Sequence, residues 1–310
     1  MKISRLVATT SILLTFAVIM ITGGCAGLEN KNNNTGQAPV ATAGQPLEKP
    51  AEPLSNQAVK VQPEAENKTI PILKPSIGVS SAEANSLENK EKVVYLTFDD
   101  GPNSHFTDKV LDILSEKKVK ATFMVVGKNV ELNPGVINRI IAEGHGVANH
   151  TYSHDYGIIY KSPEAFIADL EKNNSILKEY TRNPVYVFRA PGGPQKLGPN
   201  FKEKLKENGY YSVGWNITSV DSDPNGVTVD QEYNNIVSDL ERVERMKKTP
   251  IILMHDGTQL STTSAKPGTA LAKYIQNRES TVGVLPRVID LFLSKGYKFA
   301  LVDEHTPPAW

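Results

Sequence analysis

The stretch Tyr95–Asn103, YLTFDDGPN, places Asp99 and Asp100 side by side between an apolar run and a Gly-Pro break. The run Val93–Phe98 has the β-branched and aromatic character of a strand, and the break predicts a turn directly after it. Two adjacent carboxylates at a strand end repel each other, and without a neutralising partner one of them would have a raised pKa. A plain turn is the alternative explanation, because Asp and Gly both favour turns.

The chain changes character at Lys92, from which strand-like and helix-like segments alternate. The predicted strands are Val93–Phe98, Lys120–Val126, Gly146–Asn149, Val185–Arg189, Tyr210–Trp215, Pro250–Met254 and Tyr297–Val302. The predicted helices are Phe106–Lys117, Pro134–Glu143, Pro163–Tyr180, Asn200–Asn208, Val229–Met246 and Val284–Lys295. Strands separated by helices indicate an α/β fold with a parallel sheet and right-handed crossovers. The length of this region and its seven predicted strands favour a closed or nearly closed barrel over an open sheet.

Polar side chains follow five of these strands, at the edge where functional groups gather in parallel α/β folds. In chain order they are Asp99 and Asp100, His150 and His154, Arg189, the segment Trp215–Asp223, and His255 with Asp256. Chance would scatter such residues over both ends of the strands. The sequence therefore predicts one functional site on one rim of the barrel.

The segment NHTYSHD carries His150 and His154 four residues apart. In a helical turn both imidazoles would lie on one face and could share a cation, whereas two surface histidines are the alternative. A metalloprotease signature needs Glu after the first His, but Thr151 stands there. With Asp100 the set becomes one Asp and two His, which leaves a coordination position open, as in catalytic zinc sites. Asp99 then stays ionised beside the cation, where it can act as a general base toward water.

Four motifs, TFDDGPN, HTYSH, RAPGG and LMHDG, follow one another along the chain. Together they resemble the NodB-homology polysaccharide deacetylases (carbohydrate esterase family 4), and the likeness extends over the region Val93–Val302. The resemblance implies a distorted (β/α) barrel and the metal-dependent removal of N-acetyl groups from a polymer of N-acetylated sugars.

The resemblance also implies a role for each matching position. The expected metal ligands are Asp100, His150 and His154. The expected catalytic groups are the base Asp99, Arg189 that holds it, the acid His255, and Asp221 that pairs with this histidine and raises its pKa. The expected substrate pocket comprises the Gly192 N–H as oxyanion donor, Trp215 as the wall beside the acid, and Leu253 and Leu285 as contacts of the acetyl methyl.

Two positions depart from the family pattern. Many relatives carry Tyr where Gly192 stands, so we expect a more open sugar pocket. Relatives often have Trp directly after the aspartate that matches Asp221, but Ser222 stands here, and Asp223 is close enough to compete for the role. The segment Gly257–Ser280 is long for a strand-to-helix loop, and we expect either a substrate-facing insertion or a mobile surface loop with a short helix.

The N-terminus has the pattern of an export signal, with a positive start and the apolar run Leu6–Ile21. This run is shorter than the roughly 20 residues of a membrane-spanning helix. Gly24 precedes Cys25, the sole cysteine, in a pattern that resembles the lipobox of bacterial lipoproteins, although Thr22 replaces the usual Leu. Because a lone cysteine cannot serve an intramolecular disulfide, we favour lipidation of Cys25 over ordinary cleavage or an uncleaved anchor.

The domain organisation follows from these patterns. Residues 1–24 form the lipoprotein-type signal, and residues 25–90 contain the lipidated cysteine and a Pro-, Asn- and Ala-rich segment with too little apolar surface to fold. Residues 91–305 form the deacetylase-like domain, and residues 306–310 a tail. We therefore expect an exported monomer that is held at the outer face of a bacterial cell membrane by its lipid.

The chain has 34 basic and 34 acidic residues, and this balance argues against a nucleic-acid partner. Our leading hypothesis is a metal-dependent N-deacetylase of a cell-envelope polysaccharide, with peptidoglycan N-acetylglucosamine as first choice and zinc, cobalt, nickel or manganese as the metal. An O-acetyl esterase of the acetylxylan type and a chitooligosaccharide deacetylase are alternatives with the same site. An inactive carbohydrate-binding lipoprotein is the alternative from another class.

Overall fold

The computed structural model describes residues 91–257 and 264–309. The predicted signal peptide, Cys25 and the linker up to residue 90 lie outside these ranges and stay predictions. Within the described ranges, no helix combines the length and the apolar character that a membrane crossing requires.

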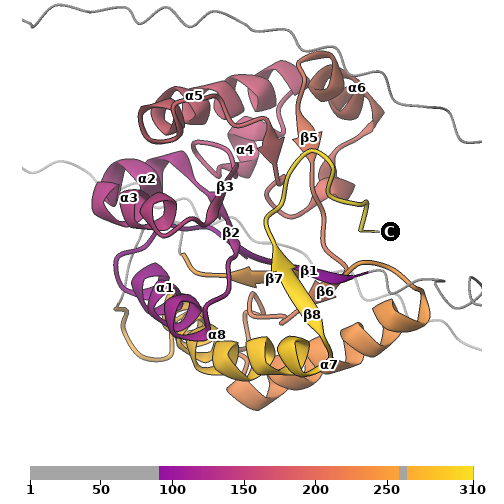
Figure 1. Ribbon diagram of the computed structural model, residues 1–310. Coiled ribbons are helices and arrows are strands. Elements are labelled where there is room, and N and C mark those ends of the chain that lie inside the picture. The colour runs from indigo at the N-terminus through magenta and orange to yellow at the C-terminus, as the bar shows by residue number, and fades with distance from the viewer. Residues whose placement is uncertain (1–90, 258–263, 310) are drawn as a thin grey trace, which may run out of the picture. The chain divides into compact units, whose positions relative to one another are not determined.

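Strands and helices alternate along the domain (Figure 1). The strands are β1 (Lys92–Asp99), β2 (Thr122–Val125), β3 (Gly146–Asn149), β4 (Val187–Phe188), β5 (Tyr211–Ser212), β6 (Ile217–Thr218), β7 (Ile251–His255) and β8 (Tyr297–Ala300). The helices are α1 (Phe106–Lys117), α2 (Gly127–Leu132), α3 (Pro134–Ala142), α4 (Tyr156–Ile159), α5 (Pro163–Thr181), the 3-10 turn η2 (Pro194–Lys196), α6 (Pro199–Glu207), α7 (Val229–Arg245) and α8 (Ala270–Ser294).

All strand pairs are parallel, and the order across the sheet is β5-β4-β3-β2-β1-β7-β6. Tyr95 of β1 pairs with both β7 and β8, and Thr97 pairs with both β7 and β2. Strands β8 and β2 therefore share the edge of β1 opposite β7. The sheet curls into a half-barrel with helices around it, which confirms the predicted distorted barrel of parallel strands.

Strand β1 separates two environments. Val94, Leu96 and Phe98 are fully buried in the main hydrophobic core, which lies between the sheet and helices α1, α3, α7 and α8. The alternate residues Thr97 and Asp99 point to the inside of the curl, because successive side chains of a strand face opposite ways. Asp99 pairs in register with His255 of β7, so these two side chains stand next to each other on the inner face.

Capping groups define where several helices begin. Thr228 and Gln231 form a reciprocal capping box at the start of α7. The Ser162 side chain accepts a hydrogen bond from the main-chain N–H of Ala165 in the first turn of α5, and the Thr269 side chain accepts one from Ala272 in the first turn of α8. Thr269 thus explains why α8 begins at Ala270, well before the helix start predicted at residue 284.

The strand predicted over residues 210–215 is wrong as a single element. Within this range only Tyr211–Ser212 forms a strand, β5, which pairs with β4, and the separate strand β6 lies beyond the range and pairs with β7. The carbonyls of Val213 and Gly214 between them accept hydrogen bonds from the Arg189 side chain instead of from a neighbouring strand. The short helices α2 and α4 were not predicted either, and α8 shortens the expected loop over residues 257–280.

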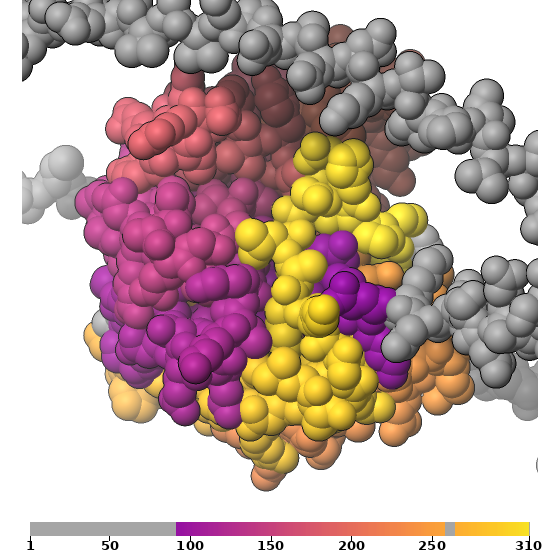
Figure 2. All heavy atoms as spheres, in the orientation of Figure 1, coloured from indigo at the N-terminus to yellow at the C-terminus, as the bar shows by residue number. Residues whose placement is uncertain are grey.

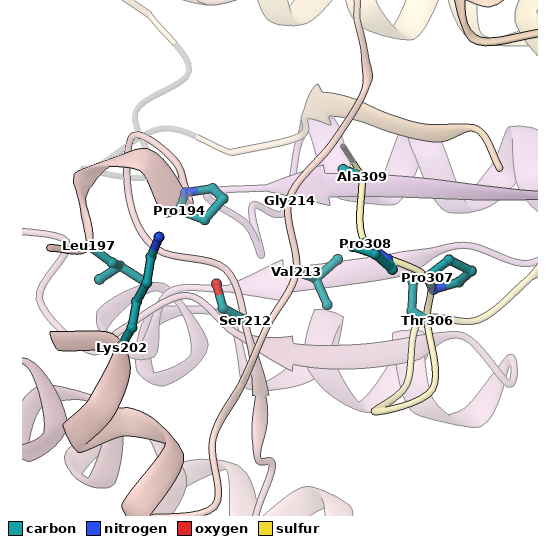
Figure 3. Close-up of a pocket in the computed structure, with 10 residues that line it drawn as sticks. All are labelled: Pro194, Leu197, Lys202, Ser212, Val213, Gly214, Thr306, Pro307, Pro308 and Ala309. Atoms are coloured by element: carbon teal, nitrogen blue, oxygen red, sulfur yellow. The ribbon is translucent and has the colours of Figure 1, made fainter. Parts of the chain in front are cut away.

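The C-terminal tail packs against the inside of the curl. Ala309 joins Val213 and Ile251 in a small apolar cluster, and its carbonyl accepts a hydrogen bond from Asn216. Figure 2 shows the yellow C-terminal residues crossing this face of the molecule beside the indigo residues of β1. A cavity of about 310 Å³ lies between the tail and residues 194–202, with Val213 and Ser212 on its floor (Figure 3).

Asn216 links the tail to the sheet. Its Oδ1 accepts from the Ile251 N–H at 2.9 Å, and its Nδ2 donates to the carbonyls of Thr249 at 2.9 Å and Ala309 at 3.0 Å. Because Asn216→Ala leaves these buried groups unpaired, we expect the free energy of unfolding to fall by about 2–4 kcal/mol in urea denaturation.

Asn208→Ala is the matched control, since the Asn208 side chain is exposed at the end of α6. We expect it to change the free energy of unfolding by less than about 1 kcal/mol. Equal losses in the two variants would contradict a specific role of Asn216.

Candidate active site

The predicted base and its arginine meet inside the curl of the sheet. Asp99 ends β1 and Arg189 follows β4, and the arginine is fully buried. Its Nη1 lies 2.7 Å from Asp99 Oδ1 and 2.7 Å from Thr97 Oγ1, while Nη2 donates to the Gly214 carbonyl at 3.0 Å. A guanidinium fixed on several sides holds the base carboxylate in one orientation.

The three predicted metal ligands lie together beside this pair. One ligand atom each from Asp100, His150 and His154 lies within 4.8 Å of the other two. Asp100 Oδ1 is 3.4 Å from His150 Nε2 and 3.2 Å from His154 Nε2. His150 Nδ1 is 2.8 Å from the main-chain oxygen of Arg189, so in the neutral ring this nitrogen carries the proton and the Nε2 lone pair faces the site.

This arrangement fits a divalent metal ion. The donor set of one Asp and two His leaves coordination positions for water and substrate. The hydrogen bond from the far side of His150 is the usual companion of a histidine ligand, because it fixes the ring and its tautomer. Zinc, cobalt, nickel and manganese all accept such donors.

The pKa of Asp100 depends on these histidines. Burial alone would raise the pKa of this carboxyl, but the charge of His154 and hydrogen bonds from His150 and His154 outweigh burial and hold the pKa well below its usual range. Burial would lower the pKa of His154, and the Asp100 carboxylate raises it instead. Asp100 therefore stays ionised next to Asp99 because cationic groups face it.

The loop that carries the two histidines does not form a helical turn. Thr151 and His154 have φ values of 66° and 52°, and Asp100 across the site has φ 74°. Left-handed backbone at a non-glycine residue costs of order 1–3 kcal/mol, so surrounding contacts must hold it. The His150 and His154 ring centroids nevertheless lie 5.1 Å apart.

Helix α5 supplies these contacts. Asp169 Oδ1 accepts from the main-chain N–H groups of Tyr152 at 2.7 Å and Ser153 at 2.8 Å. Asn173 Nδ2 donates to the Thr151 carbonyl at 3.0 Å. Both helix residues are buried, so the loop geometry is set by side chains that lie outside the recognised motifs.

The predicted acid is paired with the predicted carboxylate. His255 Nδ1 lies 2.7 Å from Asp221 Oδ1, and the His255 main-chain N–H donates to Asp221 Oδ2 at 2.7 Å. Burial would lower the pKa of His255, but the Asp221 carboxylate raises it. Asp223, the competing candidate, accepts from the Asn225 N–H in a turn instead.

A second buried arginine, Arg278 of α8, was not predicted. Its Nη1 donates to Asp221 Oδ2 at 3.1 Å, and its Nε donates to the Gly257 carbonyl at 2.9 Å. Burial would raise the pKa of Asp221, but the charges of His255 and Arg278 lower it to about 2. Arg278 thus supports the acid pair as Arg189 supports the base.

Thr281 of α8 extends this network toward α7. Its hydroxyl donates to Asp221 Oδ2 at 2.9 Å and lies 3.4 Å from Glu232 Oε2. Glu232 is fully buried, and burial together with the Asp221 charge raises the pKa of Glu232 to about 9. Glu232 is therefore neutral at pH 7 and adds no charge beside the acid.

The ends of β1 and β7 are pressed tightly together. The Asp256 N–H donates to the Asp99 carbonyl at 3.1 Å, and a Cβ on Gly101 would lie 2.6 Å from the Asp256 carboxylate oxygens. A Cβ on Gly257 would overlap the Asp100 carbonyl. The Asp256 side chain accepts from the Thr107 hydroxyl at 2.6 Å, so Asp256 buttresses the strand ends.

The predicted pocket residues differ in their placement. Leu253 is nearly buried in β7 two residues before His255, and so on the same strand face. Leu285 is fully buried in the main core, where its contact with the acetyl methyl stays a prediction. The Trp215 ring lies 5.6 Å from the Arg189 guanidinium, on the base side, and its place beside the acid stays a prediction. The role of the Gly192 N–H as oxyanion donor also stays a prediction.

Arg278 and Thr281 escaped prediction for a common reason. They lie in a segment interpreted as a loop, because the buried residues there, Asn277 to Thr281, are mostly polar and give no apolar helical period. The capping residue Thr269, followed by a run without Gly or Pro up to residue 282, was the available helix signal.

Comparisons with known proteins agree with this geometry. Residues 86–213 match the family model described as polysaccharide deacetylase. A peptidoglycan-N-acetylglucosamine deacetylase of Bacillus cereus is 30% identical over 216 residues, which are 70% of this chain and 89% of that protein. A chitooligosaccharide deacetylase of Sinorhizobium fredii is 32% identical over 207 residues, which are 66% of this chain and 87% of that protein.

Solved structures extend the comparison to the fold. A polysaccharide deacetylase from Bacillus cereus superposes with a TM-score of 0.56 at 28% identity, covering 70% of this chain and 96% of that one. A carbohydrate esterase family 4 enzyme from Streptococcus mutans gives a TM-score of 0.58 at 26% identity, covering 69% and 87%. With the family model, the relatives and the shared fold in agreement, the chain belongs to the polysaccharide deacetylase family.

Proposed function

We propose that this deacetylase removes acetyl groups from the N-acetylglucosamine residues of peptidoglycan, with a divalent metal, zinc in the first place, held by Asp100, His150 and His154. The chemistry rests on one observation: this triad is flanked by two separate ion pairs, Asp99 with Arg189 and His255 with Asp221. The choice of polymer is supported by the Bacillus cereus relative, which is a peptidoglycan-N-acetylglucosamine deacetylase.

A metal at the triad would supply Lewis-acid activation of water and of the acetyl carbonyl. Asp99 accepts the proton of the attacking water, and the hydrogen bond from Arg189 holds the carboxylate in one orientation. The Gly192 N–H donates to the acetyl oxygen as negative charge develops on it. Water oxygen thereby bonds to the acetyl carbon.

His255 completes the reaction on the other side of the bond. Its imidazolium gives a proton to the sugar nitrogen as the C–N bond breaks, and the products are acetate and a free amine. Asp221 keeps His255 charged, since the carboxylate raises the pKa of the imidazole. A base and an acid, each oriented by its own ion pair, are what amide hydrolysis requires.

The same machinery would also serve the alternatives. The Sinorhizobium fredii relative is a chitooligosaccharide deacetylase, and an O-acetyl esterase would need the base more than the acid, because an alkoxide leaves more readily than an amide nitrogen. The preference for N-acetyl substrates therefore rests on the relatives, which are named as deacetylases of N-acetylated sugars. A sugar-binding protein without activity would have no use for either ion pair.

Replacing the base tests the chemistry. Asp99→Asn keeps the size of the side chain but cannot accept the proton, so we expect acetate release to fall by about 10²–10⁴-fold while metal content stays the same. Acetate is measured on peptidoglycan sacculi, chitotetraose and acetylxylan, before and after chelation and with each divalent metal added back.

Asp290→Asn, at an exposed surface ion pair, is the matched control and should keep wild-type rates. Acetate from acetylxylan alone would identify an esterase. Full activity of Asp99→Asn, or of the chelated wild-type protein, would refute the proposed mechanism.

The acid pair makes a prediction about pH. Since the pKa of His255 is raised, its imidazolium is present below that pKa and is lost above it, and this loss sets the alkaline limb of kcat/KM. Asp221→Asn removes the carboxylate that raises the pKa, so we expect the limb to move to lower pH and the rate at pH 8 to fall about tenfold or more. If the alkaline limb of kcat/KM stays at the same pH in Asp221→Asn, a group other than His255 sets that limb.

We further propose that a lipid on Cys25 anchors the exported enzyme to the outer face of the cell membrane, with residues 26–90 as a tether. The support is the sequence pattern around Cys25. Cys25→Ser should abolish incorporation of labelled palmitate and move most of the protein out of the membrane fraction. Retention of the variant in membranes would instead point to an uncleaved N-terminal anchor.

A further inference from the structure

Tyr156 stands next to the metal ligands without belonging to the recognised motifs. It is the first residue of α4, is 42% exposed, and its ring centroid lies 5.7 Å from that of His154. A Cβ built on Gly192 would lie 2.7 Å from the Tyr156 hydroxyl. The phenol therefore occupies the space above Gly192, where relatives with a larger residue would place their own side chain.

Tyr274 lies near the acid pair His255–Asp221, next to Arg278. It lies on α8 four residues before Arg278, whose guanidinium is 5.4 Å from the centre of its ring. Arg278 in turn donates to Asp221, the partner of His255. Tyr274 is partly exposed, so its ring is available to solvent near the acid pair.

The electrostatics agree with this placement. Burial raises the pKa of Tyr156, and the charges of Asp100, Tyr274 and Asp99 raise it further. Burial likewise raises the pKa of Tyr274, followed by the charge of Asp100. Each phenol thus lies near the Asp100 carboxylate.

An exposed aromatic ring beside a charged site needs an explanation other than core packing. A pyranose ring has apolar C–H faces that pack on aromatic rings, and its hydroxyls exchange hydrogen bonds with a phenol. Binding sites for small ligands commonly combine such rings with a few fixed polar groups. Tyr156 lies beside His154 of the triad, and Tyr274 lies beside Arg278, which contacts the acid pair.

We propose that Tyr156 and Tyr274 form an aromatic clamp that holds the N-acetylated sugar over the metal triad, with the Tyr156 hydroxyl donating a hydrogen bond to the sugar beside Gly192. The clamp rests on the proposed deacetylase function and names the elements that position its substrate. Helices α4 and α8 thereby determine which sugars are accepted, while the strand ends carry out the reaction.

The test compares a sugar substrate with one that lacks a sugar. For Tyr156→Ala and Tyr274→Ala, we expect the ratio of kcat/KM on chitotetraose to kcat/KM on 4-nitrophenyl acetate to fall about tenfold, chiefly through KM for chitotetraose. Tyr156→Phe keeps the ring and loses the hydroxyl, so it should fall between wild type and the alanine variant. A purely structural role would lower both activities together and leave the ratio unmoved.

Binding is measured separately from turnover. Titration calorimetry of chitotetraose into the Asp99→Asn protein should show about tenfold weaker binding when Tyr156→Ala is added. Tyr186→Ala is the control, since this exposed tyrosine lines a different cavity with Tyr210, and it should bind as the parent does.

The outcomes separate the two proposals. An unchanged ratio, unchanged binding, or a Tyr156→Phe variant as weak as Tyr156→Ala would overturn the clamp. If the wild-type protein binds chitotetraose through both tyrosines but releases no acetate from any glycan, the clamp stands and the proposed function fails.

Discussion

Asp99 and Asp100 are adjacent carboxylates at the end of one strand, and both can stay ionised inside the protein only if positive groups face them. Two unit charges 4 Å apart repel by about 1 kcal/mol in water and by about 4 kcal/mol at an effective dielectric constant of 20. Arg189 forms an ion pair with Asp99, and His150 and His154 face the Asp100 carboxylate. The sheet order delivers them, because β3 and β4 lie on the β2 side of β1 and end at the same rim.

The acid side repeats this solution with different residues. Asp221 is completely buried, and it is tolerable there because His255 and Arg278 both contact its carboxylate. Arg189 follows a strand and Arg278 lies on a helix, yet both hold a catalytic carboxylate in place. Arg189 holds the base Asp99, and Arg278 holds Asp221, the partner of the acid. Glu232, next to Thr281, is neutral because its pKa is raised. A second buried carboxylate charge beside Asp221 would add a repulsion that His255 and Arg278 would have to offset.

The main features of the fold and site were predictable because they repeat along the chain. Each catalytic candidate follows an apolar run, and parallel strands place their carboxyl ends on one rim, so Asp99, His150, Arg189 and His255 could be grouped before any coordinates. Local sequence signals also predicted most of the longer helices.

The remaining features depend on contacts between distant segments. The left-handed conformations at Thr151 and His154 are held by hydrogen bonds between α5 and their loop. The sequence of the loop itself contains no signal that predicts them. The first turns of α8 bury polar residues, which erases the apolar period that reveals most helices. The division between β5 and β6 arises because Arg189 takes the carbonyls that a continuous strand would have paired.

At several glycines around the site, neighbouring atoms leave too little space for a Cβ atom. Gly101 and Gly257 lie where the ends of β1 and β7 meet. The Tyr156 side chain fills the space above Gly192, and the side chains of Gln195 and Trp215 fill the space above Gly193. A side chain at Gly257 would overlap the main chain of the metal ligand Asp100, and one at Gly101 would displace Asp256, whereas one at Gly192 would meet only the Tyr156 side chain. The strand ends are therefore closed to gradual evolutionary change, whereas residue 192 and residue 156 can change together, because a larger side chain at either position would fill the same space.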